Sequence, residues 1–274
     1  MTLDLATNVP AVSAAIKIIE RLAQGWPELV APGTLVNELK LNRSTCYNIL
    51  AVLEQAGWVT SRDNSPGWTL GPKLLVLTGI TDNVRNEIAQ QEIEATSAEL
   101  GFVVFIVERE RGGGYRVVAA AEKTTGVRVT VSVGDGFPFA APAIMQAFLA
   151  WTEPTEVERL VGDYGLTQFT EKSITTLEEL NAALSRVRDK GYSESIQQFN
   201  TAQGGVAAPI FDSNGRVTQV VCSLAFSSQL NSANVDSAGQ AVRRCAQVIT
   251  RRSGGTPPIG YGSLPVANRH IGQL

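Results

Sequence analysis

Five polar side chains follow closely after Asn42, and they carry the groups that hydrogen-bond to phosphate oxygens and to base edges. They are Arg43, Ser44, Thr45, Tyr47 and Asn48. Guanidinium, hydroxyl and amide groups of this kind both position a protein on a nucleic acid and read its sequence. Chemistry of this type requires that one element presents them together.

A helix over residues 43–55 presents them. The Asn42 side chain is a good N-cap, and Gly57 favours an end to the helix. At about 100° per residue, four apolar side chains share one arc of roughly 100°. These are Cys46, Ile49, Leu50 and Leu53. Most of the polar residues and Ala51 fall on the opposite face, within roughly 140°. A solvated helix face is the alternative interpretation.

The neighbouring elements occur in the order of a winged helix-turn-helix. Residues 12–23 have helical periodicity, and a short helix begins after Pro32-Gly33. After Gly57, residues 58–61 and 68–70 read as the two strands of a hairpin. Arg62 and Asn64 lie at its tip, where they can reach phosphates or a minor groove. We therefore predict that residues 32–77 contain a DNA-binding module. The alternative for the hairpin tip is a loop that is polar only because it is exposed to solvent.

Composition indicates a two-domain protein without a membrane span. The chain has 274 residues, 44% hydrophobic content and a net charge of -3. It has no apolar run of ~20 residues and no signal-peptide pattern, so we expect a cytoplasmic protein. Its three cysteines are far apart, which disfavours a disulfide framework or a zinc site.

The net charge of the N-terminal region does not by itself indicate DNA binding. Residues 1–80 hold six basic side chains, Lys17, Arg21, Lys40, Arg43, Arg62 and Lys73. They also hold six acidic ones, Asp4, Glu20, Glu28, Glu38, Glu54 and Asp63. Since the two sets cancel, we expect one copy of the module to bind weakly and to require a dimer.

The rest of the chain predicts a linker helix and a second domain. Residues 71–100 form a helical pattern with a thin apolar stripe, and Thr78-Gly79 predicts a kink or a division into two helices. Over residues 101–252, strands and helices alternate irregularly, which indicates an α+β domain. The alternating valines from Val127 to Val133 predict a strand, and residues 253–274 read as a disordered tail.

An enzyme fused to the module is disfavoured. The only histidine is His270, in the Gly/Pro-rich tail, so a histidine-dependent triad or metal site is nearly excluded. The run Gly112-Gly113-Gly114 lacks the Lys and Ser/Thr of a phosphate loop. We predict no catalytic residues, no metal and no cofactor.

The chain resembles the IclR family of bacterial transcription regulators. The resemblance is carried by residues 12–23, 42–50, 68–77 and 205–212. It implies a winged helix-turn-helix domain at 1–78 with the linker helix 71–100, and a GAF/PAS-like α/β effector-binding domain at 101–252. The chain departs from the family pattern in two places. The turn before residue 43 lacks the glycine that the family often has there. The family's Gly-Lys pair is replaced in this chain, with Met145-Gln146 nearby.

The resemblance also implies an effector pocket in the second domain. By residue matching, and from the strand and loop that would line it, the candidates are Phe105, Ala141, Met145, Ser195, Gln203, Gly205, Cys222 and Leu224. The set contains no basic residue, which favours a partly apolar or aromatic organic effector. Backbone amides near Ala143 can still hold a carboxylate.

We therefore predict a ligand-responsive regulator of transcription, with operator DNA and a small effector as partners. Control of a catabolic operon and assembly as a homodimer or tetramer are expected with it. Two alternatives remain at this point. One is a sensor that uses the winged helix for protein contacts, and the other is the enzyme fusion.

Overall fold

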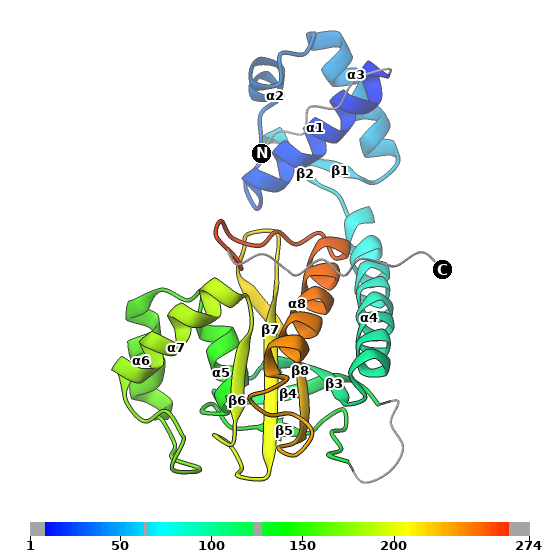
Figure 1. Ribbon diagram of the computed structural model, residues 1–274. Coiled ribbons are helices and arrows are strands. Elements are labelled where there is room, and N and C mark those ends of the chain that lie inside the picture. The colour runs from blue at the N-terminus through cyan, green and yellow to red at the C-terminus, as the bar shows by residue number, and fades with distance from the viewer. Residues whose placement is uncertain (1–8, 63–64, 123–127, 263–274) are drawn as a thin grey trace. The chain divides into compact units, whose positions relative to one another are not determined.

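The computed structural model describes residues 9–62, 65–122 and 128–262 (Figure 1). The chain divides after Asn83 into two compact units. The division falls inside α4 (Lys73–Leu100), which is a single helix through Thr78-Gly79. The predicted division into two helices is therefore wrong. The predicted domain limits at 78 and 101 remain a prediction.

The N-terminal unit has the predicted winged helix-turn-helix order. Its elements are α1 (Pro10–Gly25), α2 (Pro32–Glu38), α3 (Arg43–Gln55), β1 (Val59–Arg62) and β2 (Ser65–Leu70). Proline occupies the first turn of α1 and of α2, where its missing amide costs no hydrogen bond. The fully buried side chains of Ile18, Leu35 and Leu50 join the three helices in one core. Burial of apolar surface thus fixes how α3 lies in this unit.

The turn before α3 has an unusual backbone conformation. Lys40 has φ 53°, in the left-handed region that glycine adopts without a steric penalty. This is the turn in which the sequence lacks the family's glycine. Lys40 therefore adopts the left-handed conformation in place of a glycine, at the cost of backbone strain.

The C-terminal unit is built on one antiparallel sheet of six strands. In spatial order they are β5 (Gly136–Phe137), β4 (Tyr115–Ala121), β3 (Val103–Arg109), β8 (Val217–Phe226), β7 (Gln203–Phe211) and β6 (Ser193–Ile196). The predicted α+β class is confirmed. The strand predicted from Val127 to Val133 is wrong for residues 128–133, which form no strand, and Val127 lies outside the described residues. At that edge of the sheet, β4 pairs instead with the two-residue strand β5.

Helices cover both faces of this sheet. Val104 and Ile106 of β3 share a core with α8 (Val235–Arg252) and the second half of α4. Both helices are labelled in Figure 1. Phe105 and Val107, one residue out of phase, point to α5 (Pro142–Leu149). Behind α5 lie α6 (Pro154–Tyr164) and α7 (Leu177–Lys190).

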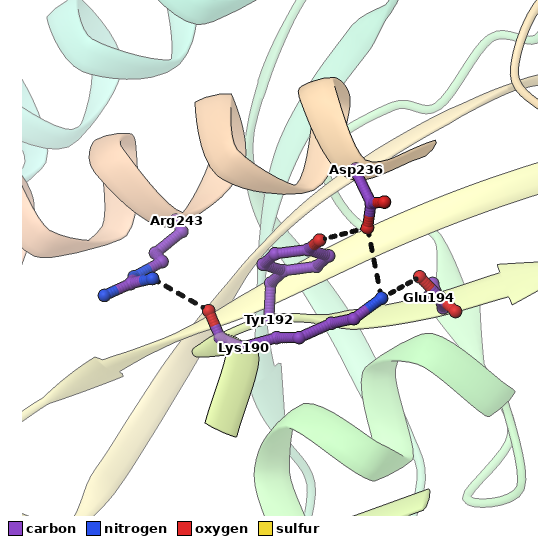
Figure 2. A network of polar contacts seen from close by, with 5 residues as sticks. All are labelled: Lys190, Tyr192, Glu194, Asp236 and Arg243. Atoms are coloured by element: carbon purple, nitrogen blue, oxygen red, sulfur yellow. Dashed lines mark hydrogen bonds and ion pairs between the residues drawn. The ribbon is translucent and has the colours of Figure 1, made fainter. Parts of the chain in front are cut away.

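A polar network fixes the edge strand β6 against α7 and α8 (Figure 2). The Tyr192 hydroxyl donates to Asp236 Oδ1 at 2.6 Å. Lys190 Nζ contacts the carboxylates of Asp236 and Glu194, each at 3.1 Å. Gly239 lies under the Tyr192 ring, where a Cβ would come within 2.1 Å of a ring carbon. The network holds the strand that carries Ser195.

The start of the C-terminal tail is packed, in contrast to the predicted disorder from residue 253. The Tyr261 ring lies 5.2 Å from Trp151 and 5.0 Å from Phe211, measured between ring centroids. Its hydroxyl donates to the Gly191 carbonyl at 3.0 Å, and Arg243 donates to the Gly262 carbonyl at 2.8 Å. Residues 263–274, with His270, lie outside the described residues.

We expect Lys40→Gly to be more stable than Lys40→Ala by about 1 kcal/mol, because only glycine relieves the left-handed strain. Both variants lose the same charge and the same exposed side chain, so the alanine variant is the matched control. Urea unfolding measures the difference. Equal stability of the two variants would contradict the strain.

The Tyr192–Asp236 hydrogen bond should stabilise the C-terminal unit in a pH-dependent way. Hydrogen bonds from Tyr192 and Lys190 lower the pKa of Asp236 below its ordinary value of 3.8. Because the pKa of Asp236 is lower in the folded state, the stabilisation is fully present above the ordinary value of 3.8. It is lost as the pH falls through the lower pKa of the folded state. Tyr192→Phe should therefore cost about 1 kcal/mol at neutral pH and less at about pH 3.

Urea unfolding at the two pH values checks this result. Asp236→Asn is the control, and in that background Tyr192→Phe should lose most of its pH dependence. An equal loss of stability at both pH values in the wild-type background would contradict the assignment.

Candidate functional site

The predicted DNA-contacting residues of α3 share an exposed surface. Arg43, Ser44, Thr45, Tyr47 and Asn48 are all exposed, whereas Cys46 and Leu50 are fully buried. The predicted cap is confirmed, because Asn42 Oδ1 accepts from the Ser44 amide at 3.1 Å. The Arg43 guanidinium lies 5.8 Å from the centroid of the Tyr47 ring, so these two side chains support each other. The start of α3 therefore offers a free helix end with hydrogen-bonding groups on one face.

The hairpin of β1 and β2, which is the wing of this module, is hydrogen-bonded to the C-terminal end of α3. Glu54 Oε1 accepts from the amide and the hydroxyl of Ser61, at 3.2 Å and 2.7 Å. This pair connects α3 to β1 and fixes where the hairpin begins. The Arg62 side chain and Asn64, the predicted contacts at the hairpin tip, lie outside the described residues.

A pocket opens beside the N-terminal end of α5, and we call it the α5 pocket. Six of the eight predicted effector residues line it. They are Phe105, Ala141, Ser195, Gln203, Gly205 and Leu224. The empty space between its walls measures about 400 Å³, open solvent included. The cross-strand pairs Ser195–Gly205 and Gly205–Leu224 bring three of these residues from three adjacent strands.

The chemistry of the α5 pocket is aromatic and uncharged. Phe105 and Phe137 stack with their centroids 5.5 Å apart, and Phe199 lies 6.4 Å from Phe137. None of the described residues that line the pocket is charged. Ser195, Ser223 and Gln203 supply hydroxyl and amide groups. No side chain caps α5, so its first amides, at Ala143 and Ile144, are available to an acceptor.

The other two predicted effector residues lie elsewhere. Met145 packs against Leu160 and Leu184 on the side of α5 that faces α6 and α7. Cys222 lies in the core between the sheet and α5, and burial raises the pKa of its thiol. Neither residue lines the α5 pocket, so their assignment to the effector site stays a prediction.

The lining residues that the sequence analysis did not name include Phe137, Phe199 and Ser223. Ser223 stands between the two predicted positions Cys222 and Leu224, and its hydroxyl donates to the Val103 carbonyl at 3.0 Å. The two phenylalanines lie outside the four longer strands, in segments without periodicity. The only sequence signal that could have identified them as pocket residues is an apolar side chain among polar neighbours.

Other site chemistries have little support. All three cysteines are free and buried, and burial raises the pKa of Cys46, Cys222 and Cys245, the last to about 12. The described residues contain no group of three or more His, Cys, Asp or Glu side chains that could hold a metal ion. Among the same residues, no helix is both long and apolar enough to cross a membrane.

Known proteins resemble the chain along most of its length. Residues 83–251 match the family model for the C-terminal domain of the bacterial transcriptional regulator IclR. The transcriptional repressor IclR of Escherichia coli is 22% identical over 251 residues, which cover 90% of this chain and 91% of the relative. The acetate operon repressor of Salmonella typhimurium is 21% identical and covers 93% and 94% of the two chains.

Solved structures agree with this match. An IclR transcriptional regulator from Alicyclobacillus acidocaldarius shares 28% identity and a TM-score of 0.59, covering 90% of this chain and 100% of that chain. The repressor BlcR of Agobacterium tumefaciens has the same fold, with 20% identity, a TM-score of 0.57 and coverage of 91% and 99%. The chain therefore belongs to the IclR family of bacterial transcriptional regulators, which are DNA-binding proteins with an effector-binding C-terminal domain and no enzymatic activity.

Proposed function

We propose that this protein controls a catabolic operon in the bacterial cytoplasm, and that a small organic effector in the α5 pocket changes its affinity for operator DNA. The observation that carries the proposal is the presence in one chain of an exposed polar face on α3 and an aromatic, uncharged pocket. The acetate operon repressor among its relatives supports a metabolic operon as the target.

Operator contact is assigned to the N-terminal end of α3 and to the wing. Arg43, Ser44, Thr45, Tyr47 and Asn48 are exposed there. The positive end of the α3 dipole favours a phosphate at the same place. Arg62 and Asn64 are proposed as further contacts from the hairpin.

We infer that the DNA-bound form is at least a homodimer on a two-fold symmetric operator. Residues 1–80 carry balanced charge, so one copy lacks the electrostatic attraction that specific binding needs. On α4, Val84 is 48% exposed and is available to a second copy. A tetramer would give the same symmetry with two such pairs.

The effector is proposed to be partly apolar or aromatic. Three phenylalanine rings surround the α5 pocket, and none of the described residues lining it is charged. A flat apolar body would therefore be stabilised by burial against these rings. Any carboxylate or carbonyl would be bound by the free amides at the start of α5 and by the Ser195 hydroxyl.

Arg43→Ala and Tyr47→Ala should each weaken operator binding by ~1–3 kcal/mol without unfolding the protein, because both side chains are exposed. A gel-shift titration at fixed salt with the region upstream of the protein's own gene measures this. Gln24→Ala on α1 is the exposed control. Unchanged affinity in both variants would assign DNA contact to another surface, and no binding at all would favour protein contacts of the winged helix.

Leu224→Trp should fill the α5 pocket and weaken effector binding by more than about tenfold. A thermal-shift screen of metabolites identifies the effector, and calorimetry then measures its affinity. Val118→Trp introduces the same side chain at an exposed strand position and is the control. Wild-type effector affinity in a folded Leu224→Trp protein would remove this pocket from the proposal.

A further inference from the structure

A second hollow lies between α5, α7 and β6, on another side of α5 from the effector pocket proposed above. Its empty space is about 360 Å³, open solvent included. We call it the Gln146 pocket, after the one polar side chain of α5, which lines it. The α5 pocket shares none of its lining residues, so the two are separate sites.

The Gln146 side chain lacks a hydrogen-bond partner that its position requires. The residue is 3% exposed, and the other seven residues of α5 are apolar. Its Nε2 is buried and has no partner among the described residues. Buried amides are almost always paired, because an unpaired one loses its hydrogen bonds to water without replacement. Helix α5 therefore presents one unsatisfied donor to this pocket.

A second unpaired amide lines the same pocket, from the segment after β6. The Oε1 of Gln198 is buried and also has no partner among the described residues. The backbone at this residue is fixed, since the hydroxyls of Thr170 and Ser173 donate to the Gln198 carbonyl at 3.2 Å and 2.8 Å. One unsatisfied donor and one unsatisfied acceptor thus share a single hollow.

The charged groups at this pocket balance one another. Lys190 Nζ contacts the carboxylates of Glu194, which lines the pocket, and of Asp236, each at 3.1 Å. Arg186 also lines the pocket and is exposed. Two cations therefore stand beside two anions, and their charges favour neither an anionic nor a cationic ligand. Selectivity is left to the two uncharged amides.

Apolar side chains line the pocket beside these amides, namely Ile174, Ala183 and Val187. The hydroxyls of Tyr192 and Ser193 already donate within the protein. A ligand that fits therefore needs an acceptor, a donor and a small apolar part. A carboxamide or a urea carries the acceptor and the donor on one carbon atom. We propose that the Gln146 pocket binds a small neutral amide or urea, whose carbonyl accepts from Gln146 and whose N–H donates to Gln198.

NMR of the full chain labelled with nitrogen-15 in its glutamine side chains tests this proposal, because it observes both amides directly. Their resonances are assigned with Gln146→Met and Gln198→Met. The probes are acetamide, propionamide and urea, titrated to about 20 mM, well above a Kd of ~1 mM. Acetone has the shape and the acceptor of acetamide but no N–H donor. We expect at least one probe to shift both resonances saturably, whereas acetone shifts neither.

Gln146→Met should weaken that binding by more than about tenfold without lowering the melting temperature, because it replaces an unpaired buried amide with an apolar side chain of similar size. Gln198→Met should give the same loss of affinity. In each variant, the remaining amide reports the binding. Gln168→Met makes the same change at an exposed position before α7 and is the control.

The proposal is overturned if no probe binds, if acetone binds as well as acetamide, or if both methionine variants keep wild-type affinity. A lower melting temperature of the Gln146→Met protein would also overturn it, because the amide then has a structural partner such as a buried water. Loss of the probe signal in Leu224→Trp, but in neither methionine variant, would place the probe in the α5 pocket and overturn the proposal as well.

Discussion

Helix α5 is buried on every side, and the C-terminal unit is organised around that burial. Its eight residues are all buried, because Ile144 and Phe148 face the sheet while Met145 and Leu149 face α6 and α7. A short helix that is apolar all round is stable only when protein surrounds it. A hollow lies at each end of the helix.

Packing also suggests how ligand binding in the α5 pocket can reach the linker helix. The pocket touches β7 and β8, and the opposite face of these strands carries Ala208 and Val221. These side chains share a core with Ala89 and Ile93 of α4. Interiors at this density transmit small displacements rather than absorb them. A coupling of ~1–3 kcal/mol, typical of allosteric proteins, requires only that the effector binds two arrangements of this core unequally.

Local signals predicted the elements whose stability is local. The Asn42 cap and the end of α3 before Gly57 both follow from capping and turn chemistry. In contrast, β6 was missed. Its sequence, Ser-Glu-Ser-Ile, has little strand propensity, and the strand forms because β7 pairs with it and the Lys190–Asp236 network supports it.

The candidate site was predicted only in part for the same reason. The side on which Met145 lies could not be predicted, because a helix with apolar residues on all sides gives no sign of which face meets the sheet. Residues 253–262 read as disordered from their glycines and prolines, whereas a single aromatic residue, Tyr261, anchors them through long-range contacts. Long-range pairing of this kind leaves no periodic signal in the sequence.

The effector site and the operator site are proposed to belong to one coupled system. Calorimetry of the identified effector, with and without saturating operator DNA, tests it most directly, since linkage requires the two ligands to change each other's affinity by the same factor. We expect operator DNA to change the effector Kd by the factor by which the effector changes the operator Kd, roughly 5–150-fold. The same effector Kd with and without DNA would contradict it.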